Sequence, residues 1–173
     1  AQQASPQSLN SHLMTGFACH AGGAYDEALL QYRLVHDLDA SFYGSYLAMG
    51  TLFADQRMFE QSIQMLNRAS AASPRNPMVI AAMAYSHGAA GRTEGAQQAA
   101  GELAHMAERQ YVPPIAQAMA QAAAGNPDTA ISKLEEAARE RSVWLPAVRF
   151  MRAFDGLRGH ARYTEVMNQL QPC

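Results

Sequence analysis

The sequence is poor in several residue types, and each shortage excludes a class of protein. Its two cysteines, Cys19 and Cys173, are too few for a disulfide framework or a cysteine-rich metal site. No apolar run approaches the roughly 18 residues of a membrane-spanning helix, so we expect no membrane insertion. A formal net charge of -2 provides no general attraction to nucleic acid. The remaining possibilities centre on a folded protein with a protein or small-molecule partner.

Sequence patterns of catalysis and metal binding are also missing. The six histidines include no pair spaced four residues apart, the spacing that places two imidazoles on one helix face. There is no Gly-x-Ser-x-Gly motif and no glycine-rich phosphate loop. Cys19 follows Gly16 by one helical turn and is interpreted as a small buried thiol. We therefore expect no catalytic residue, no metal and no cofactor.

What the sequence does contain is a small residue that recurs every 34 residues. A fixed period of this size is typical of solenoid proteins. A second small residue precedes each of these by twelve positions. We expect each such pair to lie where two antiparallel helices cross, because a larger side chain would hold the helices apart. The four pairs are Gly16 and Ala28, Gly50 and Ser62, Ala84 and Ala96, and Ala118 and Ala130.

Helix start and stop signals divide the chain into four helix pairs. Gly22-Gly23 breaks the first helix, while Asn76-Pro77 and Asn126-Pro127 are typical of a cap followed by a first helical residue. The predicted segments are a polar lead-in (residues 1–4), with Ser5 as the first helix cap, then four units (5–40, 41–75, 76–110 and 111–142) and a tail (143–173).

This pattern resembles the tetratricopeptide repeat (TPR) over about residues 9–142. The third unit departs from the family pattern at Thr93, Ala100 and Glu108. The resemblance implies an all-α, right-handed superhelical solenoid of about four TPR helix pairs, and a non-catalytic protein-binding function. The second unit matches the family best, at Tyr46, Met49, Gly50, Phe53, Phe59, Ser62, Leu66, Ala69 and Pro74.

The tail resembles a C-terminal arrangement found in multidomain bacterial regulators. The matching residues are Tyr111 to Pro114, Trp144-Leu145, Phe154 to Arg158 and Tyr163. The resemblance implies helices that cap the solenoid and a C-terminal sensing or interaction module, in a piece of a larger bacterial regulatory or assembly protein. The sequence leaves the compartment open between the bacterial cytoplasm and the periplasm. We expect one helix to run from Pro146 to Phe154. The predicted buried side of the cap consists of Trp144, Phe150, Phe154, Leu157 and Tyr163.

The TPR resemblance also implies where a partner binds, namely on the inner face formed by the first helix of each pair. This set is mostly apolar, which favours a peptide, a helix, a partner protein or a second copy of the chain. Two alternatives remain open: a small apolar or amphipathic molecule in the same cavity, or a groove filled by the chain's own first or last helix. The predicted partner-binding residues are Leu13, Met14, Phe17, His20, Leu47, Thr51, Asp55, Met78, Tyr85, Ile115 and Met119.

Charge is unevenly distributed along the chain. Residues 26–60 carry six acids and two arginines, whereas residues 139–162 carry six arginines and two acids. One interpretation is two solvated faces. The other is complementary ends that favour contacts between copies or with a partner.

Overall fold

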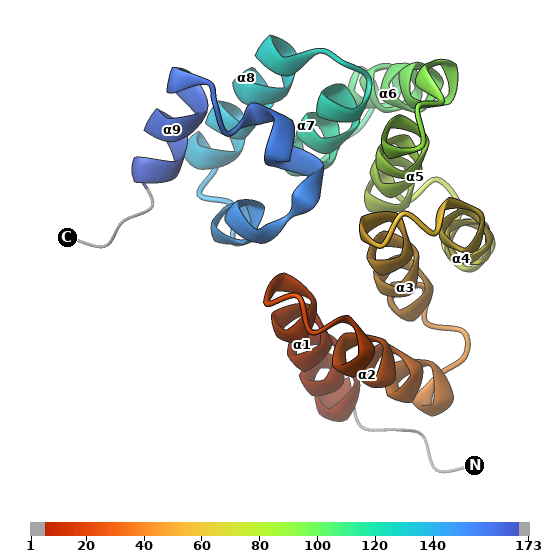
Figure 1. The fold of residues 1–173 in the computed structure, drawn as a ribbon. Coiled ribbons are helices and arrows are strands. Elements are labelled where there is room, and N and C mark those ends of the chain that lie inside the picture. Colours follow the sequence, from red (N-terminus) through yellow and green to blue (C-terminus); the bar gives the residue numbers. More distant parts are fainter. Residues whose placement is uncertain (1–5, 170–173) are drawn as a thin grey trace. The chain divides into compact units, whose positions relative to one another are not determined.

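The computed structural model describes residues 6–169, and these residues form helices and turns without any β-strand (Figure 1). The lead-in of residues 1–4, the predicted cap Ser5 and the terminal Cys173 lie outside the described residues. The chain divides into two compact units, the first ending at Val79 and the second beginning at Ile80.

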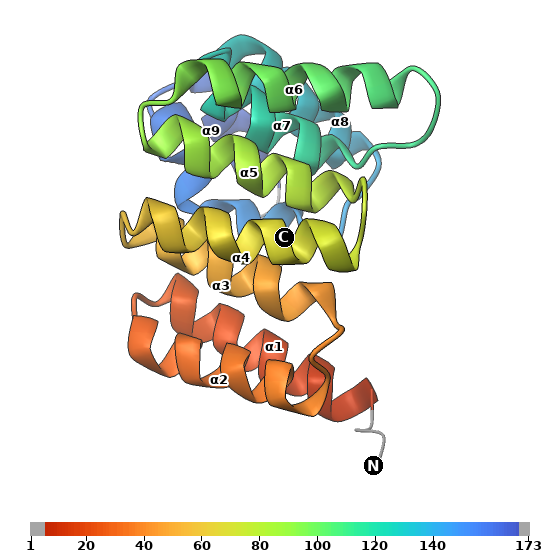
Figure 2. The ribbon, with the colours of Figure 1, turned by 90° about the vertical axis from the view of Figure 1, so that its right-hand side faces the viewer.

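The first unit contains two complete helix pairs. They are α1 (Pro6–Ala21) with α2 (Tyr25–Leu38), and α3 (Tyr43–Asp55) with α4 (Phe59–Ala72). Each helix packs against its partner, and α3 also contacts both α1 and α2 (Figure 2). The start of α5 (Pro77–Ala89) completes this unit.

The second unit continues the same pairing. It holds the rest of α5, α6 (Thr93–Ala107), α7 (Pro114–Ala123) and α8 (Pro127–Arg139). Two 3₁₀ helices, η1 (Leu145–Phe150) and η2 (Arg152–Leu157), and the short α9 (Ala161–Asn168) follow. Here α7 packs against α6, α8 and η2, and α8 also contacts η1, η2 and α9. The predicted TPR-like fold of consecutive helix pairs is confirmed.

The predicted helix crossings occur at the small residues. The Ser62 hydroxyl donates a 2.7 Å hydrogen bond to the carbonyl oxygen of Gly50 across the α3–α4 crossing. A Cβ on Gly50 would lie 2.7 Å from the Leu66 side chain, and one on Gly16 would lie 2.5 Å from Tyr32. Because neither position has room for a side chain, the 34-residue repeat marks real close approaches between helices.

The turns inside the helix pairs follow the same period. Gly23, Arg57, Gly91 and Gly125 are spaced 34 residues apart, and all have a positive φ, between 61° and 82°. In each turn the next residue's N–H donates to the carbonyl five positions back, at 2.8–2.9 Å. This is the Schellman arrangement that ends many helices and that favours glycine. Arg57 is the non-glycine member of the series.

The two predicted asparagine caps behave differently. The side-chain oxygen of Asn76 accepts a 3.0 Å hydrogen bond from the Met78 N–H, so this cap is confirmed. Asn126 precedes α8, but its side chain makes no cap hydrogen bond and instead donates to the Gln121 side-chain oxygen at 2.9 Å. The prediction of a side-chain cap at Asn126 is therefore wrong.

The tail differs from the predicted single helix. Met151 is extended, with φ -86° and ψ 118°, and it separates η1 from η2. Since a 3₁₀ helix has three residues per turn, positions three apart share a face. Leu145 and Val148 are buried in this way, as are Phe154 and Leu157.

The predicted buried side of the tail is therefore only partly correct. Phe154, Leu157 and Tyr163 are buried. Trp144 and Phe150 are instead 53% and 58% exposed, because the 3₁₀ period turns them away from the face that packs on the helix pairs.

Candidate functional site

The first helices of the first unit carry the predicted partner-binding residues as two stripes. Leu13 and Phe17 are four residues apart on α1, and Leu47 and Thr51 are four apart on α3, so each pair shares one side of its helix. All four side chains are half-buried, while Met14 is 51% exposed. Met78, at the start of α5, is also half-buried. We call Leu13, Met14, Phe17, Leu47 and Thr51 the first-helix face.

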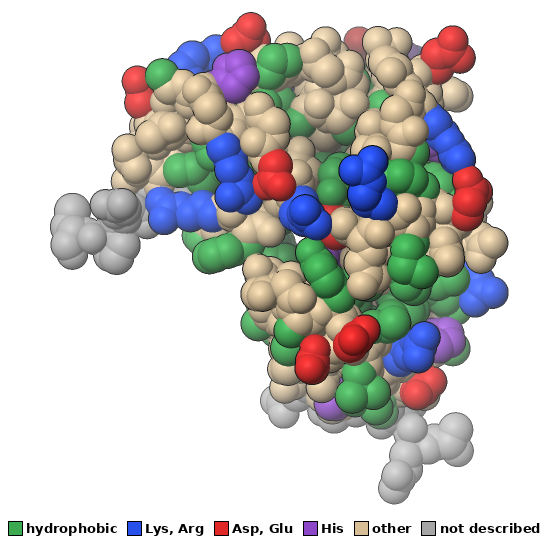
Figure 3. Space-filling model, in the orientation of Figure 1, with side chains coloured by type: hydrophobic (Ala, Val, Ile, Leu, Met, Phe, Trp, Pro, Cys, Tyr) green, Lys and Arg blue, Asp and Glu red, His purple; other side chains and the backbone are tan. Residues whose placement is uncertain are grey.

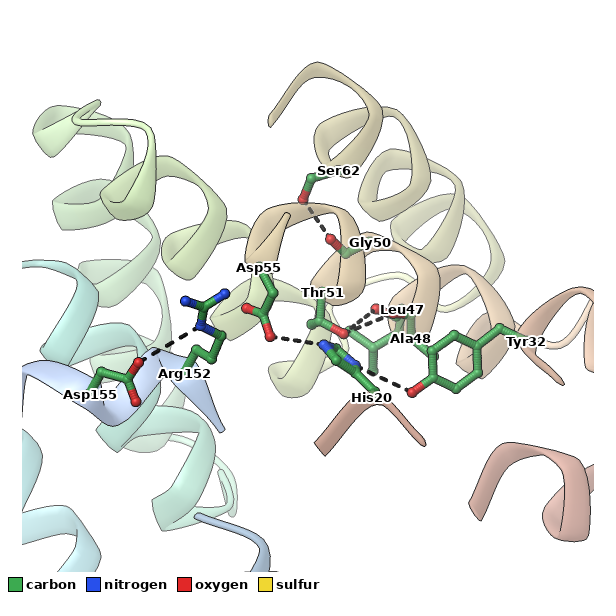
Figure 4. Close-up of polar contacts among 10 residues, drawn as sticks. All are labelled: His20, Tyr32, Leu47, Ala48, Gly50, Thr51, Asp55, Ser62, Arg152 and Asp155. Carbon is green, nitrogen blue, oxygen red and sulfur yellow. Dashed lines mark hydrogen bonds and ion pairs between the residues drawn. The ribbon is translucent and has the colours of Figure 1, made fainter. Parts of the chain in front are cut away.

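A hydrogen bond between His20 and Asp55 joins the two stripes. The His20 Nε2 and a carboxylate oxygen of Asp55 are 2.8 Å apart, and both side chains are about nine-tenths buried (Figure 4). On the other side of the ring, the Tyr32 hydroxyl lies 3.4 Å from His20 Nδ1. Burial raises the pKa of Tyr32, and nearby Cys19 and Asp55 raise it further. The phenol therefore stays protonated and can donate to Nδ1.

This network ties three helices together, because His20, Tyr32 and Asp55 belong to α1, α2 and α3. Both His20 ring nitrogens have partners inside the protein, which makes this histidine a structural link between helices. The Thr51 hydroxyl is also satisfied internally, donating to the carbonyl oxygens of Leu47 and Ala48 on its own helix at 3.2 and 2.9 Å (Figure 4). The contact chemistry of the first-helix face is therefore mainly apolar.

The predicted partner-binding residues on α7 of the second unit are buried. Ile115 and Met119 on α7 are only 4% and 2% exposed, and α7 is packed against α6, α8 and η2. Met119 was predicted to belong to an exposed or ligand-filled apolar patch, and its side chain is not exposed because the chain's own helices pack around α7. Tyr85 on α5 is half-buried.

The arginine-rich tail is partly compensated within the second unit. Arg158 and Arg152 approach the carboxylate of Asp155 at 2.7 and 3.9 Å (Figure 4 shows the second pair). Arg162 contacts the carboxylate of Glu135 at 3.0 Å. These exposed pairs reduce the positive charge that the tail presents, and pairs of this kind contribute little to stability.

A cleft in the first unit was not predicted from the sequence. Its volume is about 370 Å³, and it lies where α2, α3 and α4 meet. Arg33 and Arg68 are exposed, and the apolar lining residues belong to or pack against the core of this unit. We call it the α2–α4 cleft, and its lining residues are Leu29, Arg33, His36, Asp37, Tyr46, Met49, Phe53, Met65 and Arg68.

A sequence signal for this cleft exists in hindsight. Tyr46, Met49 and Phe53 follow an i, i+3, i+7 pattern, which places three large side chains on one side of α3. Arg33 and His36 lie on α2 at a similar spacing after Leu29. A stripe that combines apolar and cationic residues predicts an amphipathic edge, although the spacing alone does not bring α2, α3 and α4 together.

Two further features concern residues 6–169 as a whole. This part of the chain contains no group of three or more histidine, cysteine or acidic side chains arranged to hold a metal ion. It also contains no helix whose length and apolar character would let it cross a bilayer. Hydrophobic side chains reach the surface in separate patches among charged ones (Figure 3).

Comparison with known proteins places the fold but not the activity. No family model matches the sequence, and no curated protein matches it. A solved structure of pilF from Pseudomonas aeruginosa, a TPR-containing protein, is similar with a TM-score of 0.58 and 15% sequence identity. The match covers 96% of this chain and 78% of the pilF chain. At this identity the likeness supports a TPR-like fold alone.

Proposed function

We propose that the chain is a non-catalytic protein-interaction module whose first-helix face binds a peptide, a helix or a partner protein. TPR-like folds generally act as scaffolds, and stacked helix pairs create extended binding surfaces. The observation that carries the proposal is the exposure of Met14 beside Leu13 and Phe17 on α1. A flexible methionine next to an aromatic ring suits an apolar partner surface.

The wider role is part of the same proposal. The tail resembles that of multidomain bacterial regulators, so we place the chain in a regulatory or assembly protein whose partner is another protein or a second copy of itself. A peptide or helix with two or three apolar side chains on one side fits the first-helix face, because this face consists of two mainly apolar stripes, Leu13 with Phe17 on α1 and Leu47 with Thr51 on α3.

The test uses a displayed peptide library selected on the purified chain. Peptides that bind the first-helix face should bind the Met14→Asp variant about tenfold more weakly than the wild type. The new carboxylate would lie at the centre of an apolar contact, where it must lose its bound water. The matched control is Leu30→Asp on α2, since Leu30 is 57% exposed and lies outside the face. Affinity is measured by fluorescence anisotropy.

Folding must be the same in both variants for the comparison to count. Circular dichroism and thermal melting should match the wild type, since both substitutions alter surface side chains. Equal affinity of the selected peptides for Met14→Asp and the wild type would overturn the proposed face.

A further inference from the structure

The α2–α4 cleft has the features of a second binding site, separate from the first-helix face. We propose that it binds an acidic peptide segment in which a large apolar side chain lies next to one or two carboxylates. The proposal stands independently of the first-helix face, because none of the residues that line this cleft belongs to that face.

The floor of the cleft is apolar and firmly supported. Met49 is 6% exposed and belongs to the core cluster, and Tyr46, Phe53 and Met65 pack against that cluster. A cleft of about 370 Å³ is at the lower end of the range for ligand pockets, and it has room for one large side chain. Methionine and aromatic side chains together form adaptable apolar contacts.

The rim supplies positive charge that the unit itself does not use. Arg33 on α2 and Arg68 on α4 are exposed, and within residues 6–169 neither forms an ion pair. Asp37 is the single acid in the lining. Guanidinium groups recognise carboxylates through paired hydrogen bonds, so the excess of arginine favours an acidic partner.

His36 lines the same cleft beside Tyr46. Its Nδ1 is buried and has no hydrogen-bond partner, while its ring packs on Tyr46 with the centroids 5.1 Å apart. The cleft therefore combines an apolar floor with a cationic rim.

The surrounding charge decides between an acidic peptide and a nucleic acid. The charged side chains that line the cleft are Arg33, Arg68 and Asp37, so it lacks the broad cluster of positive charge that a nucleic acid requires. A short segment with one or two carboxylates matches the two arginines of the rim. This argument selects a peptide of low charge, with the apolar side chain providing most of the contact area.

The experiment titrates three tripeptides into the ¹⁵N-labelled full chain and follows the amide resonances by NMR. The probe is N-acetyl-Glu-Trp-Glu-amide, and its matched controls replace the glutamates by lysine or the tryptophan by alanine. We expect the acidic tryptophan peptide to shift amides of α2, α3 and α4 and to bind about tenfold more tightly than either control.

Variants then assign the binding to the cleft. Arg33→Glu with Arg68→Glu should weaken the acidic tryptophan peptide at least about tenfold and favour the lysine peptide, because the sign of the rim is reversed. Arg109→Glu, an exposed arginine of the second unit, is the charge control. Met14→Asp should leave this binding unchanged, which separates the cleft from the first-helix face.

Three results would overturn the proposal. The first is equal affinity for the acidic and lysine peptides. The second is that the amide resonances shifted by the acidic tryptophan peptide belong to residues outside α2, α3 and α4. The third is wild-type affinity in the folded double arginine variant.

Discussion

Equivalent positions of the first helices are buried to different extents in α1 and α3 of the first unit and in α7 of the second unit. One repeat position holds Leu13, Leu47 and Ile115, because these residues are separated by multiples of 34. The position four residues later holds Phe17 and Met119, which are also separated by a multiple of 34. In the first unit these side chains are half-buried, whereas Ile115 and Met119 are 4% and 2% exposed. The repeat position alone therefore does not determine whether a residue is available to a partner.

The difference follows from what comes next in the chain. After α8, the tail returns and η2 packs against α7, while η1, η2 and α9 contact α8. A helix pair cannot bury its apolar faces alone, and the end of an array needs a covering element. In the second unit, the tail contacts α7 and α8, as a covering element would, and in the first unit the face of α1 and α3 keeps the exposed Met14.

Removal of the tail should have the largest effect on this difference in burial. Truncation after Arg141 should expose α7 and α8 and cause aggregation, because it deletes the buried Phe154, Leu157 and Tyr163. Each large apolar side chain contributes about 1.5–3 kcal/mol when it is fully buried. Size-exclusion chromatography and thermal melting are the measurements, and a soluble monomer of residues 1–141 with unchanged melting would contradict the capping role.

A matched pair of point variants tests the same packing of the tail if the shortened chain cannot be purified. Phe154→Ala should destabilise the protein by about 3–5 kcal/mol, since Phe154 is fully buried. Phe150→Ala, at a position 58% exposed, should change stability by less than about 0.5 kcal/mol. Equal effects of the two variants would show that the 3₁₀ face is misassigned.

A change of intermediate size probes the crossing between α3 and α4. Gly50→Leu should cost about 1–3 kcal/mol or more, because even a Cβ at this position would lie 2.7 Å from Leu66. The control is Gly101→Ala, where a new Cβ meets nothing within 4 Å and alanine favours the helix. Denaturant unfolding measures both, and an unchanged midpoint for Gly50→Leu would mean that the helices separate without cost.

The repeat geometry was the most predictable part of the molecule, because close helix crossings require small residues and these recur at a fixed period. The tail was less predictable. Trp144 and Phe150 are apolar, and a short segment does not distinguish a period of 3.6 from one of 3.0. Once η1 is a 3₁₀ helix, Leu145 and Val148 occupy its buried face instead.

The candidate sites show a similar limit. Resemblance to TPR proteins predicted which helix carries Leu13, Phe17 and Leu47, and the structure places these residues on α1 and α3. It did not predict the α2–α4 cleft, since Arg33 and Arg68 are 35 residues apart and meet only through the packing of three helices. Contacts between neighbouring repeats therefore require the structure.

The smallest expected effect concerns the one turn of the series that lacks glycine. Arg57 adopts φ 61° at the repeat position where Gly23, Gly91 and Gly125 have φ between 74° and 82°. A left-handed conformation costs a non-glycine residue about 1–2 kcal/mol. Glycine avoids this cost, but it lowers the free energy of unfolding by about 0.4–1 kcal/mol because the unfolded chain has more freedom at a glycine. Arg57→Gly should therefore stabilise the protein by about 0.5–1 kcal/mol, because the exposed Arg57 side chain loses little. Gly91→Ala, at the same position of the next pair, should shift the unfolding midpoint in the opposite direction by a similar amount. If both substitutions moved the midpoint in the same direction, the shared left-handed turn would not determine their effect.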